Sequence, residues 1–583
     1  MQQLEVQVML RRIFSYMKEY KKYAWLALIC IGVEVVLEIM VPKLMADLID
    51  IGVTNSDVPY IVNKGIQMAV CAVAALILGV GSARFSALAG QGLGANIRKA
   101  EYEKLQSYSF SNIDHFSVSS LVTRLTSDVT NIQNAVSTGM RPFGRSPVML
   151  IFATTLAFQI NSTLALVFLV ALPVLAVMLI IIIINVGPRY GRMQGAVDLV
   201  NRCIEENLTA VRVVKSYVRG DYEIEKFRNV NDNLKNESEK AFGIAVLNMP
   251  TMQFVMYSTI LGILLIGGRL INSGQMMIGQ LTSFLSYVLL ILNSLMMMSN
   301  VFLLMTRSLA SAERIMKVID EPIDITDENA KDIEVKKGEI EFNHVWFKYK
   351  DTAKEYVLSD VSFHINAGQT VGIIGQTGSS KTTLIQLIPR LYDASKGEIK
   401  IDGINVKEYP VRHLRDAISV VLQKNTLFSG SLIDNLRWGD ENATLDEIKE
   451  ACSIACVDEF IDRLPGGLDA EMGQEGVNVS GGQKQRICIA RAILKKPKVL
   501  ILDDSTSAVD TATEGKIRNA LAKKLPDMTK IIIAQRISSV CHADQIIIMD
   551  GGRVDAIGTH ESLLKTNKIY QEIYESQKEG ADL

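Results

Sequence analysis

At 583 residues the chain is longer than one domain of ordinary size, so at least two domains are expected. Hydrophobic residues make up 48% of it and charged residues 21%, a combination that indicates a membrane-embedded part joined to a water-soluble part. The formal net charge of −2 gives no indication of nucleic acid as a partner.

Long apolar segments fill the N-terminal half of the chain. Each exceeds the roughly 20 residues that a helix needs to cross a bilayer. We predict six spans, at residues 23–49, 60–90, 137–160, 163–187, 245–270 and 278–305. Buried helices of a large soluble protein are the alternative, and six such runs in series argue against it.

The distribution of Lys and Arg orients these spans, because basic connections stay on the cytoplasmic side. Several basic residues precede the first span, whereas residues 55–59 carry none and are expected outside. Residues 91–136 and 188–244 are rich in Lys and Arg, and their helical periodicity predicts long cytoplasmic helices. We therefore predict a multi-pass protein of the cell membrane, embedded in the lipid bilayer, with both the N- and C-termini cytoplasmic.

Four charged residues lie within the predicted spans, where an unpaired charge is costly. Glu34 and Glu38 are four residues apart and share one helix face, and Arg141 and Arg145 are spaced in the same way. We predict that the two pairs meet inside the helix bundle or line a wet cavity. The sequence leaves open whether they form a fixed ion-pair network or contact a transported molecule.

The second half of the chain has the pattern of an α/β domain. An acidic stretch marks residues 323–335 as a linker, which separates a transmembrane domain at 1–322 from a domain at 336–583. Short β-runs there alternate with helices. A buried strand at 371–374 leads into a glycine-rich loop and then an apolar helix. The loop residues are Gly375, Gln376, Thr377, Gly378, Ser379, Ser380, Lys381, Thr382 and Thr383.

This arrangement of strand, loop and helix predicts a phosphate-binding site with ATP and Mg²⁺ as cofactors. Backbone N–H groups and the helix N-terminus face the phosphates, while Lys381 reaches the β and γ oxygens. Thr382 supplies a hydroxyl to Mg²⁺. A second hydrophobic strand, at 498–502, ends in Asp503, the expected Mg²⁺ partner, which is followed by Asp504.

A third motif makes the prediction specific. The residues Ser480, Gly481, Gly482 and Gln483 open a helix about 20 residues before the strand that carries Asp503. With this motif, the whole chain resembles an ATP-binding cassette (ABC) exporter half-transporter of the six-span type. The resemblance implies a six-helix transmembrane domain of the type I exporter fold, followed by an α/β P-loop nucleotide-binding domain.

The resemblance also implies roles for individual residues. Tyr349 is expected to stack on adenine, and Gln423 to link Mg²⁺ to the membrane domain. Residues 480–483 are the signature sequence of the family, and residues 507–510, ending in Asp510, are its D-loop. Segments near 112–116 and 207–212 are expected to be the coupling helices.

Three positions depart from the family pattern on the phosphate-loop side. Asp504 stands where a glutamate normally polarises the attacking water, and Gln535 stands where a histidine normally approaches the γ-phosphate. Ser380 replaces the glycine before the lysine. Asp is one methylene shorter than Glu, and misplacing a reacting group by about 1 Å can cost on the order of 10²-fold in rate. Gln535 carries no positive charge. A site that holds ATP without rapid turnover is therefore predicted.

The intact signature predicts a partner. In this family each ATP lies between the phosphate loop of one chain and the signature of the other. A chain with a good signature and a poor base fits a second, different half-transporter that supplies the glutamate and the histidine. The alternatives are a homodimer with two slow sites and a sequence altered in the laboratory.

The expected function is ATP-driven export of small hydrophobic compounds, with lipids or peptides as the next candidates. The chain is thus expected to be an ATP hydrolase coupled to transport, with hydrolysis mainly at the partner's site. A cassette protein that gates a channel or regulates a partner would be favoured by long regulatory insertions, and none is visible. A soluble ATPase of DNA repair or translation has no spans.

Overall fold

The structure is a computed structural model, and it describes residues 2–350, 352–505 and 508–579. The chain forms two compact units. Unit 1 comprises Met1–Gln106 and Val118–Asp320, and unit 2 comprises Ser107–Ser117 and Glu321–Leu583.

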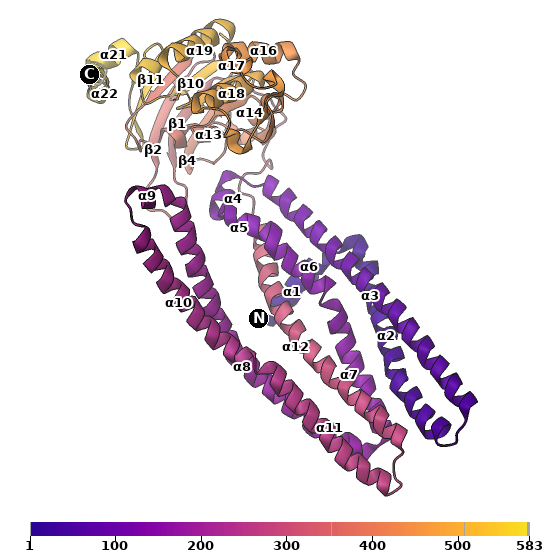
Figure 1. Cartoon of the computed structure of the whole chain (residues 1–583). Helices are drawn as coiled ribbons and strands as arrows, with labels where there is room; N and C mark the ends of the chain where they lie inside the picture. Colours follow the sequence, from indigo (N-terminus) through magenta and orange to yellow (C-terminus); the bar gives the residue numbers. More distant parts are fainter. Residues whose placement is uncertain (1, 351, 506–507, 580–583) are drawn as a thin grey trace. The chain divides into compact units, whose positions relative to one another are not determined.

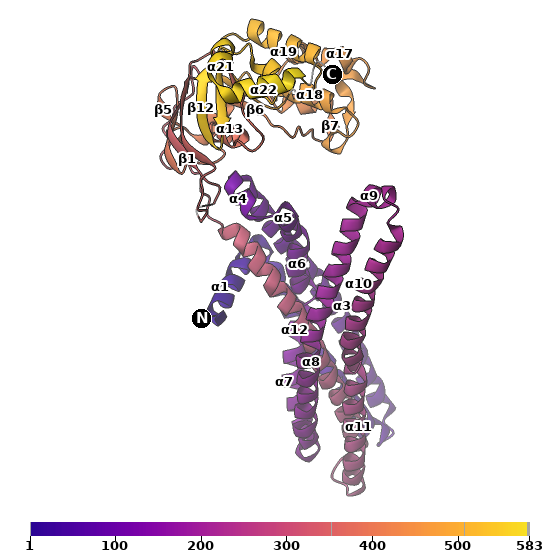
Figure 2. The same cartoon turned by 90° about the vertical axis from the view of Figure 1, so that its left-hand side faces the viewer.

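Unit 1 is built from helices (Figure 1). Its long helices are α2 (Lys21–Asp47), α3 (Val58–Gln106), α7 (Met140–Ile160), α8 (Ser162–Thr209), α10 (Gly220–Ala245), α11 (Asn248–Asn272) and α12 (Ile278–Asp320). Shorter helices are α1 (Gln2–Ser15), α5 (Val118–Thr123), α6 (Val129–Ser137) and α9 (Val211–Ser216). Helices α8 and α10 run side by side and are joined through α9, as the turned view also shows (Figure 2).

Five helical segments in the described part of the chain are long and apolar enough to cross a membrane. They are Lys18–Val53, Val58–Gln106, Val118–Ile160, Gly220–Asn272 and Ile278–Met298. Six spans are therefore not confirmed. The missing one, expected at 163–187, falls in α8, where Ser162–Met178 is a shorter apolar helix and where the side chains of several residues are not described.

Unit 1 has an apolar interior and apolar exposed faces. In its interior, the rings of Phe168 and Phe284 stack 5.3 Å apart between α8 and α12. On α3, by contrast, the side chains of Val70, Val73 and Ile77 are more than half exposed. Apolar side chains on the outside of a helix bundle are what a hydrocarbon environment favours.

Unit 2 contains a six-stranded sheet in the order β12-β11-β3-β10-β9-β6, in which only β12 is antiparallel to its neighbour. Its strands are β3 (Thr370–Ile374), β6 (Ile418–Val421), β9 (Val499–Asp503), β10 (Thr529–Ile533), β11 (Gln545–Asp550) and β12 (Arg553–Gly558). A four-stranded antiparallel sheet has the order β2-β1-β4-β5. Its strands are β1 (Ile340–Phe347), β2 (Leu358–Ile365), β4 (Lys396–Ile401) and β5 (Ile404–Asn405). Gly430–Ser431 and Glu471–Met472 form the short pair β7 and β8.

Helices cover the six-stranded sheet. The ones around it are α13 (Lys381–Leu387), α14 (Val411–Asp416), α15 (Leu432–Arg437), α16 (Leu445–Ile454), α17 (Asp458–Ile461), α18 (Gly481–Leu494), α19 (Thr511–Lys524), α20 (Ile537–Val540), α21 (His560–Thr566) and α22 (Lys568–Glu579). Successive side chains of β9 point to opposite faces of the six-stranded sheet. Leu500 and Leu502 pack with α16, α18 and α19, whereas Val499 and Ile501 pack on the side of α13.

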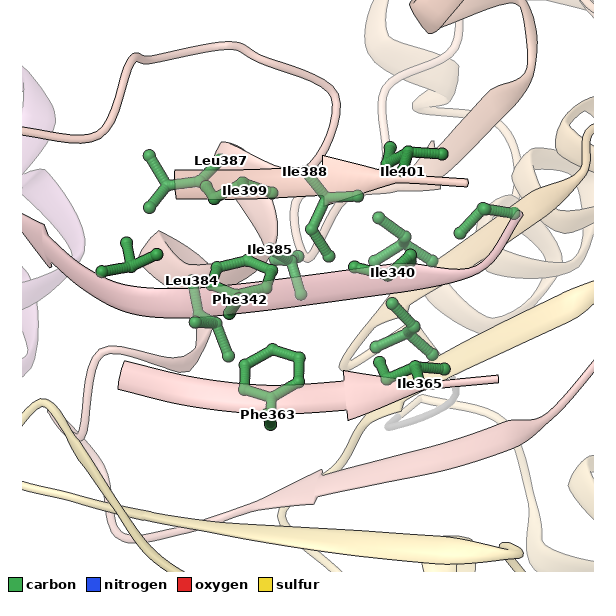
Figure 3. Close-up of a cluster of buried hydrophobic side chains, with 14 of the residues drawn as sticks. Ile340, Phe342, Phe363, Ile365, Leu384, Ile385, Leu387, Ile388, Ile399 and Ile401 are labelled. Atoms are coloured by element: carbon green, nitrogen blue, oxygen red, sulfur yellow. The ribbon is translucent and has the colours of Figure 1, made fainter. Parts of the chain in front are cut away.

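The helix that follows the glycine-rich loop is held by the four-stranded sheet (Figure 3). Leu384, Ile385 and Leu387 of α13 are fully buried beside β1, β2 and β4. In the sheet, Phe342 is paired with Phe363, and their rings stack 4.4 Å apart. This core fixes the N-terminus of α13, and with it the end of the loop.

One short helix of unit 2 comes from an early part of the chain. It is α4 (Phe110–His115), which is capped by Ser109. The hydroxyl of Tyr392 donates to Asp114 at 2.6 Å, and Asn112 donates to the carbonyl of Pro322 at 2.8 Å. The residues 107–117 therefore pack with the domain that follows residue 320. The expected coupling segment at 112–116 overlaps this helix.

Candidate functional site

The predicted nucleotide residues gather at one edge of the six-stranded sheet. The strands β3, β10, β9 and β6 are neighbours and parallel, so their carboxyl ends meet at one edge, where ligands of α/β sheets bind. The glycine-rich loop follows β3, Gln535 follows β10, Asp503 ends β9, and Gln423 follows β6. The order of strands brings together residues that are far apart in the sequence.

The glycine-rich loop wraps around the amino group of Lys381. Its Nζ donates to the carbonyl oxygens of Gly375 and Gln376, both at 2.8 Å, and lies 3.2 Å from the Oγ of Ser379. A Cβ atom at Gly375 would lie 2.2 Å from the carbonyl oxygen of Met549, so only glycine fits there. Burial lowers the pKa of Lys381, and the nearby charges of Asp503 and Asp504 oppose that shift.

Ser380 adopts the left-handed conformation, with φ 69° and ψ 24°, just before α13 begins. This conformation costs a residue with a Cβ roughly 1–2 kcal/mol relative to the right-handed one. The position therefore asks for glycine on backbone grounds. Its side chain makes no capping hydrogen bond that would compensate.

Asp503 and Thr382 face each other across the edge of the sheet. The hydroxyl of Thr382 donates to Oδ1 of Asp503 at 3.3 Å. Asp503 is only 2% exposed, and its Oδ2 has no hydrogen-bond partner among the described residues. Burial raises the pKa of Asp503, and the like charge of Asp504 adds to that increase.

A buried carboxylate oxygen without a partner, beside a hydroxyl, suits Mg²⁺, which prefers oxygen ligands. No group of three or more His, Cys, Asp or Glu side chains in the described part of the chain could hold a metal by itself. The residues present therefore fit an ion that shares its coordination with phosphates and water. Asp503 and Thr382 would hold it.

Asp504 is engaged by two side-chain amides. Nε2 of Gln535 donates to its Oδ2 at 2.9 Å, and Gln423 also hydrogen-bonds it. Burial raises the pKa of Asp504, and these two hydrogen bonds oppose that increase. The backbone of Asp504 has φ 47°, and its N–H donates to the carbonyl of Ile533 at 3.0 Å. The two unusual positions, Asp504 and Gln535, are thus in direct contact.

Tyr349, the expected adenine platform, is 43% exposed and stands among aromatic rings. Its ring meets Phe347 and Tyr392 edge-on, with centroids 4.9 and 5.2 Å away. Its hydroxyl lies 2.9 Å from the Oγ1 of Thr383 on α13. This bond ties the ring to the helix that starts at Lys381, a contact that the sequence did not reveal.

The signature residues begin α18. Ser480 caps this helix by a reciprocal pair of bonds with Gln483, one from each backbone N–H to the other side chain. A Cβ at Gly482 would lie 2.7 Å from the carbonyl oxygen of Ala508, so the D-loop packs directly against this glycine. Gln485 accepts from the N–H of Ala508 at 3.1 Å.

The D-loop is described only in part. Ser507, its first expected residue, lies outside the described residues. Asp510 caps α19 by accepting from the N–H of Thr513 at 2.9 Å, and that bond holds the pKa of Asp510 below its usual value.

The four intramembrane charges come together in unit 1. Arg141 binds Glu34 at 2.6 Å, and Arg145 binds Glu38 at 2.5 Å and approaches Glu34 at 3.5 Å. All four line a cavity of about 810 Å³ between α2, α3, α7 and α12, together with apolar side chains such as Leu76 and Leu289. The side chain of Glu34 is 4% exposed and that of Arg141 42%. The structure thus contains both an ion-pair network and a cavity.

Two further contacts were missed by sequence reasoning. Tyr392 joins Tyr349 to Asp114 of α4, and Gln577 in α22 contacts the backbone beside Gln535. Each links residues that are distant in the chain, and neither carries a motif. Only the aromatic character of Tyr392, shortly after the loop helix, could have served as a signal.

Comparison with known proteins supports the geometry. The family model described as ABC transporter transmembrane region matches residues 24–295, and the one described as ABC transporter matches residues 358–507. An ABC transporter ATP-binding protein of Bacillus subtilis is 37% identical over 575 residues, which are 98% of this chain and 100% of that protein.

Other relatives bear more specific names. An ATP-dependent lipid A-core flippase of Pseudomonas putida is 32% identical over 97% of this chain and 95% of its own length. A putative multidrug export ATP-binding/permease protein of Bacillus subtilis is 32% identical, with 83% of each chain covered. A solved bacterial Atm1-family ABC exporter with ATP bound shares the fold, with a TM-score of 0.82 at 22% identity, covering 96% of this chain and 99% of that one.

Proposed function

The chain belongs to the ABC transporter family, as an exporter half-transporter with a membrane domain and one ATPase domain, and from this premise we propose that it is one subunit of a heterodimer that exports small hydrophobic compounds. The ATPase domain couples ATP hydrolysis to transport. This chain holds ATP at its own site and supplies its signature to the site of a different partner chain.

The contact between Gln535 and Asp504 carries this proposal. An attacking water needs a carboxylate that is free to polarise it, and the shorter side chain of Asp504 is turned to two amides instead. Gln535 has no charge to place beside the γ-phosphate, where electrostatic stabilisation contributes most. Binding groups such as Lys381, Thr382 and Asp503 are retained, which favours occupancy over turnover.

The signature supports the other half of the proposal. Its helix α18 is well capped and presents Ser480, Gly481 and Gly482 at its N-terminus, where backbone N–H groups and the helix dipole favour an anion. A chain with a weak catalytic base but an intact signature can take part in rapid ATP hydrolysis only beside a partner with an intact base.

The cavity lined by the four charges bears on the substrate. Its apolar walls suit a hydrophobic compound, which is the proposed class. The charges and the likeness to a protein named lipid A-core flippase favour a lipid as the second candidate. Vesicles that contain the complex separate the two, by uptake of a lipophilic dye or by flipping of a fluorescent phospholipid.

The ATPase rate of the purified chain tests the heterodimer. By itself the chain is expected to bind ATP but to turn it over about 10²-fold more slowly than the complex with its partner. Turnover at the rate of the complex, with no second polypeptide in the preparation, would contradict the proposal.

A pair of restoring substitutions tests the cause. The double variant Asp504→Glu/Gln535→His is expected to raise turnover by the chain alone by about 10²-fold, and each single variant by less, because groups that act as a unit do not contribute additively. An unchanged rate in the double variant would show that these two positions do not limit hydrolysis.

A further inference from the structure

Helix α22, the last helix that the structure describes, lies next to the segment that carries Gln535. This segment leaves β10 at Ile533 and enters the short helix α20 at Ile537. Helix α22 runs alongside it and presents Gln577 to the backbone.

The amide of Gln577 uses both of its polar groups on this segment. Its Nε2 donates to the carbonyl oxygen of Gln535 at 2.7 Å, and its Oε1 accepts from the N–H of Ile537 at 2.8 Å. One planar amide therefore fixes two backbone groups that flank Arg536. Since a side-chain amide has a donor and an acceptor in fixed geometry, the two bonds set both the position and the tilt of the segment.

Helix α22 is itself firmly anchored. Tyr570 is fully buried in a cluster that includes Ala534 and Ile537, and it also contains Ile374, the residue before the glycine-rich loop. The hydroxyl of Tyr570 lies 2.7 Å from Nδ1 of His560 on α21. Ile573 and Tyr574 pack against the same cluster, so the buried contact of the helix reaches to within one turn of Gln577.

We propose that Gln577 is a positioning residue for the nucleotide site, which clamps the backbone at Gln535 so that the side-chain amide of Gln535 is aimed at Asp504 and at the terminal phosphate of ATP. The inference rests on the proposed nucleotide site, and it adds the C-terminal helix to it. Because Gln535 addresses only the third phosphate, loss of the clamp affects ATP and spares ADP.

Nucleotide affinities of the full-length chain in detergent test the clamp. The dissociation constants of ADP and of a non-hydrolysable ATP analogue are measured in the presence of Mg²⁺. Gln577→Leu removes both bonds and is expected to lower the preference for the ATP analogue over ADP by about fivefold, the ratio that one net hydrogen bond is worth. Gln577→Glu keeps the acceptor for Ile537 but not the donor to Gln535, and is expected to lose the same preference.

Two further variants separate positioning from general stability. Gln571→Leu removes a bond of similar length on the same helix, from Nε2 to the carbonyl of Leu564 at 2.7 Å, and it is expected to leave the preference unchanged. Gln535→Ala is expected to lose the preference, and adding Gln577→Leu to it should then have no further effect.

Three results would overturn the clamp. In the first, Gln577→Leu weakens the binding of ADP and of the ATP analogue equally. In the second, Gln577→Leu binds nucleotide with an unchanged preference for the ATP analogue. In the third, Gln577→Leu still lowers that preference when Gln535→Ala is already present. A wild-type chain that binds neither nucleotide would overturn the proposed function itself, and the clamp with it.

Discussion

Ser380 shows how a single backbone angle can identify a misfit. Its left-handed φ of 69° favours glycine, so Ser380→Gly is expected to raise the free energy of unfolding by about 0.5–1 kcal/mol, after the extra chain entropy of glycine is deducted. Thermal unfolding of the purified chain measures this. Ser453→Gly, the same change at an exposed position of helix α16, should destabilise by a similar amount. A change in the free energy of unfolding in the same direction for both variants would contradict backbone strain at Ser380.

The buried charge of Asp503 is expected to lower the stability of the fold while it serves metal binding. Because burial raises its pKa in the folded state, the folded chain binds more protons than the unfolded one above the unfolded pKa, and stability falls as pH rises through that window. At neutral pH, Asp503→Asn is therefore expected to raise the melting temperature in a chelating buffer.

The Asp503→Asn variant should also lose the thermal stabilisation that Mg²⁺ adds to the ATP-bound chain. In wild type, MgATP is expected to stabilise the chain more than ATP with chelator, whereas in Asp503→Asn the two conditions should give the same melting temperature. A lower melting temperature of the variant in chelating buffer would show that the charge of Asp503 favours the fold.

At the scale of elements, the ion pairs between α2 and α7 bear on stability. Glu34→Gln removes the carboxylate that both Arg141 and Arg145 contact. Arg145 keeps Glu38, and Arg141 is 42% exposed, so a loss of about 2 kcal/mol is expected. The double variant Glu34→Gln/Arg141→Gln should recover most of it. Unfolding in detergent and a double-mutant cycle measure the coupling.

An exposed pair on α12 serves as the control. Lys317 binds Glu313 at 2.9 Å, and both side chains are more than 60% exposed, so removing this pair should cost about 1 kcal/mol or less. Equal losses from the two pairs would show that burial does not set the cost.

Elements could be predicted from the sequence where a local pattern encodes them. The strand before Gly375, the capped helix at Ser480 and the apolar helices of the N-terminal half follow from periodicity, glycines and caps within short windows. The spacing of Glu34 and Glu38 against Arg141 and Arg145 also anticipated a meeting of the pairs.

Other features could not be predicted, because they depend on contacts between distant segments. Nothing near Asp114 indicates that α4 packs against Tyr392, and nothing near Gln577 indicates a bond to Gln535. The count of six spans rests on hydropathy alone, and the described part of α8 does not confirm it. The left-handed backbone at Ser380 could also not be predicted, because the sequence shows only that a serine replaces a glycine there.

At the scale of the whole molecule, the heterodimer predicts that substitutions in one chain act at two different sites. Gly482→Val would force a side chain against the carbonyl of Ala508 and disturb the signature that faces the partner's ATP. It is expected to lower the ATPase rate of the purified complex by about 10²-fold, the typical loss for a misplaced group. Asp504→Asn in the same chain is expected to change that rate less than about twofold.

The comparison of the two variants decides between the assemblies. In a homodimer each site contains Asp504, so both variants would reduce the rate together. Nucleotide binding to each variant by itself serves as the control, since both retain Lys381 and Thr382.

The helix α4 has a consequence for how this protein can be divided. Unit 2 is assembled from Glu321–Leu583 and the insert Ser107–Ser117, so its natural border does not follow a single cut in the gene. A fragment that starts at residue 321 would leave the hydroxyl of Tyr392 and the carbonyl of Pro322 without the groups that bind them in the full chain. The short segment at 107–117 is thus a structural part of the same unit as the cassette. A cassette exchanged between transporters is expected to keep these contacts only if that segment travels with it.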